Sequence, residues 1–75
     1  MTVNKSHLDE LERLLQKSLA AVETDLSEQD RSDVREYIDH GEYGVAYELL
    51  AFVLNKQKLA HPTALIEAGR KMGMG

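Results

Sequence analysis

The residue types best suited to catalysis or metal binding are few and widely spaced in this chain of 75 residues. The three histidines, His7, His40 and His61, lie far apart, and none is paired with a second histidine or an acid at a zinc-binding spacing such as H-E-x-x-H. Asp39 and His40 could form an orienting acid and a base, but adjacent residues on a helix point about 100° apart. The chain has no cysteine to act as a nucleophile or thiolate ligand. We therefore predict a protein that is not an enzyme and that holds no metal ion or cofactor.

Three ligand-carrying motifs were compared with the sequence, and none fits it. The segment 41–44, GEYG, is too short to cradle phosphates and lacks the Lys and Ser or Thr that follow in a P-loop. The acidic segment 25–36 lacks the central glycine and the alternating oxygen ligands of a calcium loop. Acyl carrier proteins are also small acidic helical bundles, but they carry an Asp-Ser-Leu triplet, whereas this chain has Asp25, Leu26 and Ser27 in that order. A carrier-like or ligand-binding bundle is kept as a third hypothesis.

Charge is distributed very unevenly along the chain, although the formal net charge is only −4. Residues 23–48 contain nine acids and two bases, Arg31 and Arg35, whereas bases outnumber acids in the remainder. Nucleic-acid affinity comes largely from Lys and Arg that replace counterions at the phosphates. The acidic middle of the chain therefore argues against a nucleic-acid partner, including a helix-turn-helix mode of DNA binding. It favours a basic protein partner.

Hydrophobic periodicity predicts an all-α domain of about four helices with short connections, spanning residues 1–75, and no strand pattern competes with it. A capping box at Ser6 and Asp9 predicts the start of the first helix. Apolar residues then recur on one face at steps of three and four, at Leu8, Leu11, Leu14, Leu15, Leu19 and Val22. Ser27 with Asp30 predicts the start of a second helix that ends near His40, followed by Gly41 in a left-handed conformation.

The third helix is predicted from about Glu42, at the centre of the domain. Its buried positions are expected at Val45, Ala46, Leu49, Leu50, Val53 and Leu54, with Phe52 broadening the apolar arc to roughly 200°. Tyr43 and Tyr47 are expected along the border of this arc. Pro62 can open a fourth helix that buries Leu65, Ala68, Gly69 and Met72 and ends at Gly73. Gly69 either permits a close backbone approach or weakens this helix.

Length bounds what such a domain can bury, since a chain this short removes only about 60% of its unfolded surface from water. Without disulfides, help from a partner is plausible, and a homodimer is one way to obtain it. The N-terminal residues carry charges and no apolar run, which argues against a secretory signal peptide. The longest apolar run, residues 49–54, is far shorter than the about 20 residues of a membrane span. We expect a cytoplasmic protein without a membrane partner.

The middle of the sequence resembles a known family. Residues 36–50, EYIDHGEYGVAYELL, combine a helix end, a glycine turn followed by acid-aromatic-glycine, and Ala-x-Glu-Leu in the next helix. This stretch resembles the MafI family of small bacterial immunity proteins. The similarity extends loosely from Leu26 to Asn55 and includes the ending KMG at residues 71–73, about half the chain in all.

The resemblance implies a helical immunity protein that binds the C-terminal domain of a cognate secreted toxin, frequently a ribonuclease, in contact-dependent growth inhibition. A basic ribonuclease cleft and an acidic helical surface would be complementary. The candidate partner-binding residues are Asp30, Asp33, Glu36, Asp39, Glu42, Tyr43 and Tyr47. Tyr37 could also supply contact area, but we assign it to core packing. The alternative is a small helical adaptor or regulatory domain that forms a homodimer.

Overall fold

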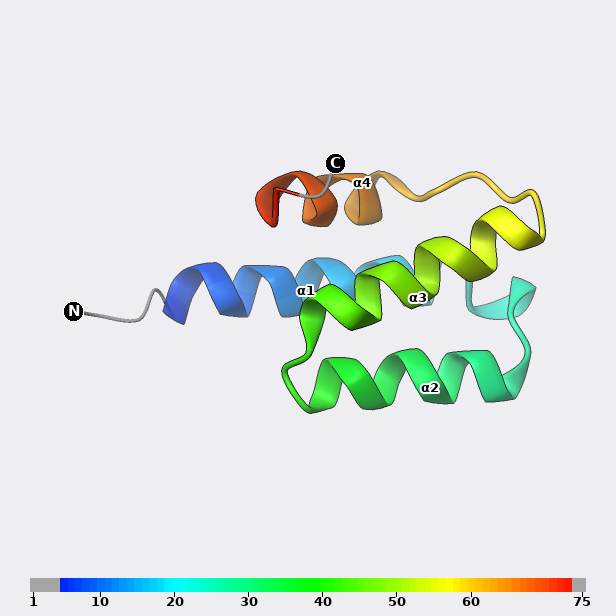
Figure 1. The fold of residues 1–75 in the computed structure, drawn as a ribbon, viewed down its shortest axis with the longest axis horizontal. Coiled ribbons are helices and arrows are strands. Elements are labelled where there is room, and N and C mark those ends of the chain that lie inside the picture. Colours follow the sequence, from blue (N-terminus) through cyan, green and yellow to red (C-terminus); the bar gives the residue numbers. More distant parts are fainter. Residues whose placement is uncertain (1–4, 74–75) are drawn as a thin grey trace.

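The computed structural model describes the backbone of residues 5–73 and the side chains of residues 7–73. It contains α1 (Lys5–Ala21), a short 3-10 turn η1 (Glu23–Asp25), α2 (Glu28–Asp39), α3 (Tyr43–Lys56) and α4 (Thr63–Lys71), and residues 5–73 include no strand. Helices α1 and α3 lie next to each other and each packs against the other three, while α2 and α4 flank them on opposite sides (Figure 1). The prediction of a small all-α domain of about four helices is confirmed.

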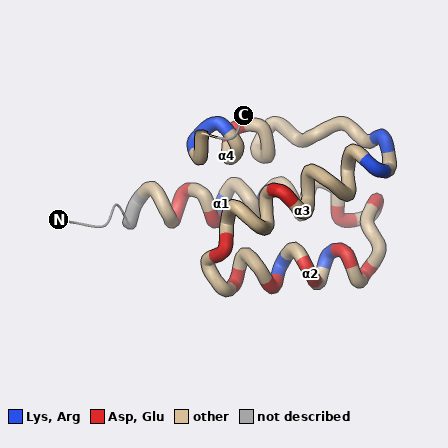
Figure 2. The backbone as a smooth tube through the Cα atoms, in the orientation of Figure 1, with Lys and Arg blue, Asp and Glu red and all other residues tan. Residues whose placement is uncertain are grey.

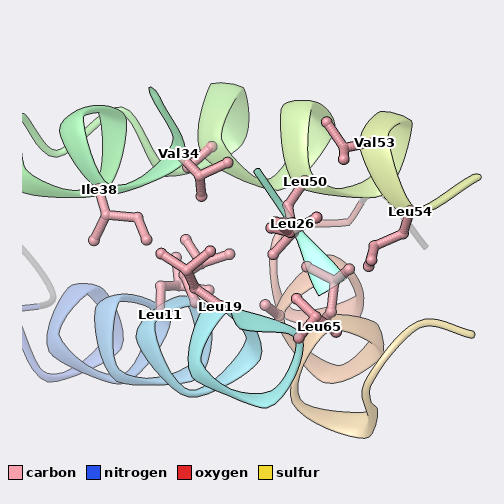
Figure 3. Packing of buried hydrophobic residues seen from close by; sticks show 13 residues of the cluster. Leu11, Leu19, Leu26, Val34, Ile38, Leu50, Val53, Leu54 and Leu65 are labelled. Atoms are coloured by element: carbon pink, nitrogen blue, oxygen red, sulfur yellow. The ribbon is translucent and has the colours of Figure 1, made fainter. Parts of the chain in front are cut away.

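All four helices contribute to one hydrophobic core. Figure 3 shows leucine, valine and isoleucine side chains of α2 and α3 packed against leucines of α1 and α4, with Leu26 of the α1–α2 connection between them. Leu15, Leu50, Leu54 and Leu65 are completely buried. Of the residues expected on the buried face of α1, Leu8 alone is exposed, at 40%. Ser18 also lies on this face, where its hydroxyl donates to the carbonyl of Leu14 at 2.7 Å.

Both predicted ends of α2 are confirmed. The Ser27 hydroxyl oxygen accepts the backbone N–H of Asp30 at 3.1 Å, and this satisfies one of the donors that the first helical turn leaves unpaired. After the helix, Gly41 has φ +76°, and the next backbone N–H, that of Glu42, donates to the carbonyl of Tyr37 at 2.9 Å. Together with the bond from the N–H of Gly41 to the carbonyl of Ile38 at 3.0 Å, this forms a Schellman turn, which reverses the chain directly into α3.

A long side chain also holds the connection before α2. The guanidinium Nη1 of Arg31 donates to the carbonyl oxygens of Glu23 and Leu26, at 2.8 and 2.9 Å. Arg31 therefore ties η1 and the following extended residue to the first turns of α2. This contact could not be predicted from sequence spacing, because it depends on how the connection folds back.

The start of α1 differs from the prediction, since the helix begins at Lys5 and Ser6 lies inside its first turn. The predicted capping contact of Ser6 lies outside the described side chains. The α4 helix begins one residue later than predicted, so that Pro62 occupies the N-cap and its carbonyl accepts from the N–H of Ile66 at 3.1 Å. Gly73 follows the helix with φ +75°, as expected for its last position.

The predicted buried arc of α3 is too wide. Phe52 is 62% exposed and Val45 is 43% exposed, whereas Ala46, Leu50, Val53 and Leu54 are buried. The physical reason is that α1, α2 and α4 all pack on the side of α3 that contains Leu50. Phe52 lies two residues further along, about 160° around the helix, where no described element covers it. The apolar pattern marks both a buried face and an exposed one.

Candidate partner-binding surface

Three of the predicted acidic residues meet where α2 turns into α3. Asp33, Glu36 and Glu42 line a groove of about 480 Å³ together with Tyr37, His40 and Leu49. The Schellman turn at Gly41 brings them together, because it places the first residues of α3 beside the last turns of α2. We call this set of six residues the acidic groove.

No Lys or Arg side chain lines the acidic groove. Among residues 7–73 the one ion pair within 4.0 Å joins Lys71 to Glu10, at 3.4 Å, and it involves none of the groove acids. Asp33 accepts a hydrogen bond from the side-chain amide of Gln29 at 2.8 Å, which orients its carboxylate. The ring N–H at Nδ1 of His40 donates to the carbonyl of Glu36 at 2.9 Å. The groove therefore presents oriented acceptors to a cationic group.

Two predicted acids lie outside the acidic groove. Asp39 points away from it, into a separate hollow between α1 and α2 that also contains Gln16 and Arg35. Asp30 belongs to the first turn of α2 and is half-buried. The acids of α2 thus face more than one direction, because successive positions spread around the helix. Asp33, Glu36 and Glu42 are the predicted acids that the fold brings together.

The tyrosines that were predicted to bind a partner make contacts inside the domain. The Tyr43 hydroxyl donates to Oε1 of Glu12 on α1 at 3.2 Å. Burial is the main cause that raises the pKa of Tyr43 above its ordinary value, and the nearby charges of Glu12 and Asp9 and the hydrogen bond to Glu12 add to it. Tyr43 therefore links α3 to α1.

Tyr47 lies against the backbone of α4 at Gly69. A Cβ added to Gly69 would fall 2.6 Å from the Tyr47 hydroxyl oxygen and 2.7 Å from the ring carbon Cζ. Such distances are too short for carbon, so the ring occupies the space that any other residue's side chain would need. Of the two roles considered for Gly69, the structure shows the close approach. Tyr37 packs against the hydrophobic core, as predicted, and its half-buried side chain also lines the acidic groove.

An exposed apolar row runs along the outer face of α3 beside the acidic groove. It consists of Val45, Leu49 and Phe52, which are spaced i, i+4 and i+7 and therefore share one helix face. Val45 and Phe52 are exposed and Leu49 is half-buried. We call these three residues the α3 stripe. The sequence signal for it was present, but it is identical to the signal for a buried face.

Charge is segregated at the level of the whole domain. Figure 2 shows acidic residues along α2, interrupted by two basic ones, and further acids at the turn into α3, while basic residues lie at the C-terminal ends of α3 and α4. Helix α2 lies on the opposite side of the α1–α3 pair from α4 (Figure 1). The uneven charge of the sequence thus gives a side around α2 in which acids predominate, with bases gathered at the ends of α3 and α4.

Metal sites, membrane-spanning helices and similarity to known proteins were also considered. No group of three or more His, Asp or Glu side chains within residues 7–73 is arranged to hold a metal ion. Of the helices in this part of the chain, none combines the length and apolar character that a membrane crossing needs. Comparison with protein-family models, with curated proteins and with solved structures finds no match for this chain.

Proposed function

We propose that this protein is an immunity protein that binds and neutralises a cognate bacterial toxin domain, in the cytoplasm and without any enzymatic activity of its own. The observation that carries the proposal is the acidic groove, in which Asp33, Glu36 and Glu42 converge without a Lys or Arg among the lining residues. The resemblance of residues 36–50 to the MafI family covers the same segment. Both point to the end of α2 and the start of α3.

The chemistry favours a ribonuclease as the toxin. A ribonuclease must attract phosphates and therefore presents Lys and Arg around its substrate cleft. Carboxylates held on rigid helices can take the place of those phosphates through charge-assisted hydrogen bonds. The separation of charge seen in Figure 2 would also orient the two proteins as they approach, which speeds association at low ionic strength.

A second candidate function is a helical adaptor or regulatory domain that forms a homodimer. The observation that favours it is the α3 stripe, since Phe52 and Val45 expose apolar surface that a second copy could cover. Sedimentation velocity distinguishes the two candidates. A monomer at micromolar concentration agrees with the immunity protein, whereas a stable dimer that binds no toxin supports the adaptor.

The proposed function requires a toxin domain encoded beside this protein, and the experiment that tests it uses the C-terminal domain of the protein encoded directly upstream. Co-expression of the two should allow the cells to grow where the toxin domain alone arrests growth, and the purified pair should form a stable complex. RNA cleavage by the purified toxin domain should fall as this protein is added, with complete inhibition at saturation. An absence of both complex and protection would overturn the proposal.

A further inference from the structure

We infer that the α3 stripe and the acidic groove form one continuous docking surface, and that its occupant is an amphipathic helix with apolar residues on one face and Lys or Arg beside them. The inference rests on the proposed function and names the part of the partner that is recognised. Leu49 belongs to both parts of this surface, because it lines the acidic groove and is also the central residue of the α3 stripe. The apolar and the charged parts of the surface are therefore contiguous.

The dimensions of the stripe suit a helix. From Val45 to Phe52 the stripe covers seven residue steps of α3, or about 10 Å along the helix axis at 1.5 Å per residue. That distance equals two turns of a partner helix, which would contact the stripe through residues spaced i, i+4 and i+7. Phe52, 62% exposed in this structure, offers the largest apolar area of the three.

The charges around the stripe specify which helix fits it. Asp33, Glu36 and Glu42 lie on the groove side of the stripe. Glu48, an exposed acid one turn before Phe52 on α3, lies on the opposite side of the stripe from Leu49. Lys56, one turn after Phe52, is a single base at the end of the row. A partner helix that places Lys or Arg on either side of its apolar residues would satisfy these carboxylates.

The same charges disfavour a second copy of this chain as the occupant. Two copies that paired through their α3 stripes would bring two sets of four carboxylates toward one another, with one lysine from each copy to offset them. Like charges placed opposite one another across an interface weaken association and select against the wrong partner. A cationic helix removes this repulsion and covers the same apolar area.

The first test is a nuclear magnetic resonance titration of the full chain. The probe is a synthetic amidated helical peptide with leucine at i, i+4 and i+7 and lysine at the flanking positions. Saturable shifts are expected at the amides of Val45, Leu49 and Phe52 and along the acidic groove. The substitution Phe52→Ala should weaken the affinity by about tenfold or more, since a few residues with large side chains usually supply most of the binding energy.

A matched control comes from α4, where Ile66 is 50% exposed. The substitution Ile66→Ala removes a similar exposed apolar side chain and should leave the affinity unchanged. A second peptide, with glutamate in place of lysine, should bind much more weakly. The inference is overturned if both peptides bind equally, if the shifts fall on α4, if no saturable binding occurs, or if wild-type protein is a dimer that Phe52→Ala dissociates.

A second measurement separates this inference from the proposed function. If the toxin domain binds wild-type protein and the Phe52→Ala variant with equal affinity, the docking surface is wrong and the immunity function stands. If the neighbouring toxin domain is not bound while the lysine peptide behaves as described, the immunity function fails and the docking surface stands.

Discussion

Gly69→Ala is the substitution whose effect follows most directly from the packing of α4. In an ordinary helix interior this change stabilises the protein by about 1 kcal/mol, because alanine restricts the unfolded chain and favours helix. Here the new Cβ would lie 2.6 Å from the Tyr47 hydroxyl oxygen and 2.8 Å from the ring carbon Cε1. Displacing a packed side chain in this way costs about 1–3 kcal/mol. The two effects oppose each other, and we expect a net loss of about 1 kcal/mol.

The cause of the loss can be isolated with a double-mutant cycle. In a Tyr47→Ala background the ring is absent, so Gly69→Ala should stabilise the domain by about 1 kcal/mol through helix propensity alone. The sign of the effect should therefore reverse between the two backgrounds, which identifies a direct interaction between the two positions. Urea and thermal unfolding followed by circular dichroism measure it, and 1 kcal/mol corresponds to a shift in Tm of about 4–8 °C for a domain of this size.

Gly44 provides the matched control, since it also lies in a helix but a Cβ added to it meets no atom within 4 Å. Gly44→Ala should raise Tm in the wild-type background, by up to about 4–8 °C. If Gly69→Ala raises Tm as Gly44→Ala does, Tyr47 does not pack on α4 as described. Tyr47 would then be available for a partner, as the sequence first suggested.

Three further predictions concern single contacts. The raised pKa of Tyr43 means that its neutral phenol stabilises the fold below about pH 10 and that this contribution is lost as the pH rises through the raised value. Ultraviolet titration should therefore show that the phenolate signal removed by Tyr43→Phe has a midpoint above 10.0, and a midpoint at or below that value would contradict the contact with Glu12. Lys58, whose φ is +58°, adopts a conformation that disfavours a side chain, so Lys58→Gly should stabilise the domain by about 1 kcal/mol, and a lower urea midpoint would refute this. Ser27→Ala removes the cap of α2 and should cost about 1 kcal/mol, measured by the same urea unfolding, whereas an unchanged midpoint would show that the cap does not contribute.

Most helices of this fold could be predicted from the sequence, because hydrogen bonds between residues close in the chain determine where they begin and end. Ser27 and Gly41 set the two ends of α2, and each acts through bonds to residues within a few positions. The left-handed residue after α3 was not foreseen, because Lys58 stands where glycine is usual and the Schellman bond from Leu59 to Leu54 holds it there. Sequence signals predict such a turn only when the typical residue occupies it.

The candidate site was only partly readable, because it depends on which face of each helix is covered. Acidic residues on α2 could be identified, but the separation of Asp39 from Asp33 and Glu36 follows from the position of α1. Phe52 and Leu50 are equally apolar in the sequence, and only the packing of the other helices buries one and exposes the other. Tyr47, predicted to contact a partner, packs on Gly69 of α4 for the same reason, whereas Tyr37 packs against the core as predicted.

The most direct measurement for the central claim compares two triple variants that change the net charge equally. One variant, Asp33→Asn with Glu36→Gln and Glu42→Gln, removes the charges of the acidic groove. The other, Glu23→Gln with Glu28→Gln and Asp39→Asn, removes three exposed charges outside it. Calorimetric titration against the cognate toxin domain that the proposed function requires should give a Kd about 10- to 100-fold weaker for the groove variant, with a much smaller change for the other. Equal losses for both variants, or no loss for either, would contradict recognition by the acidic groove.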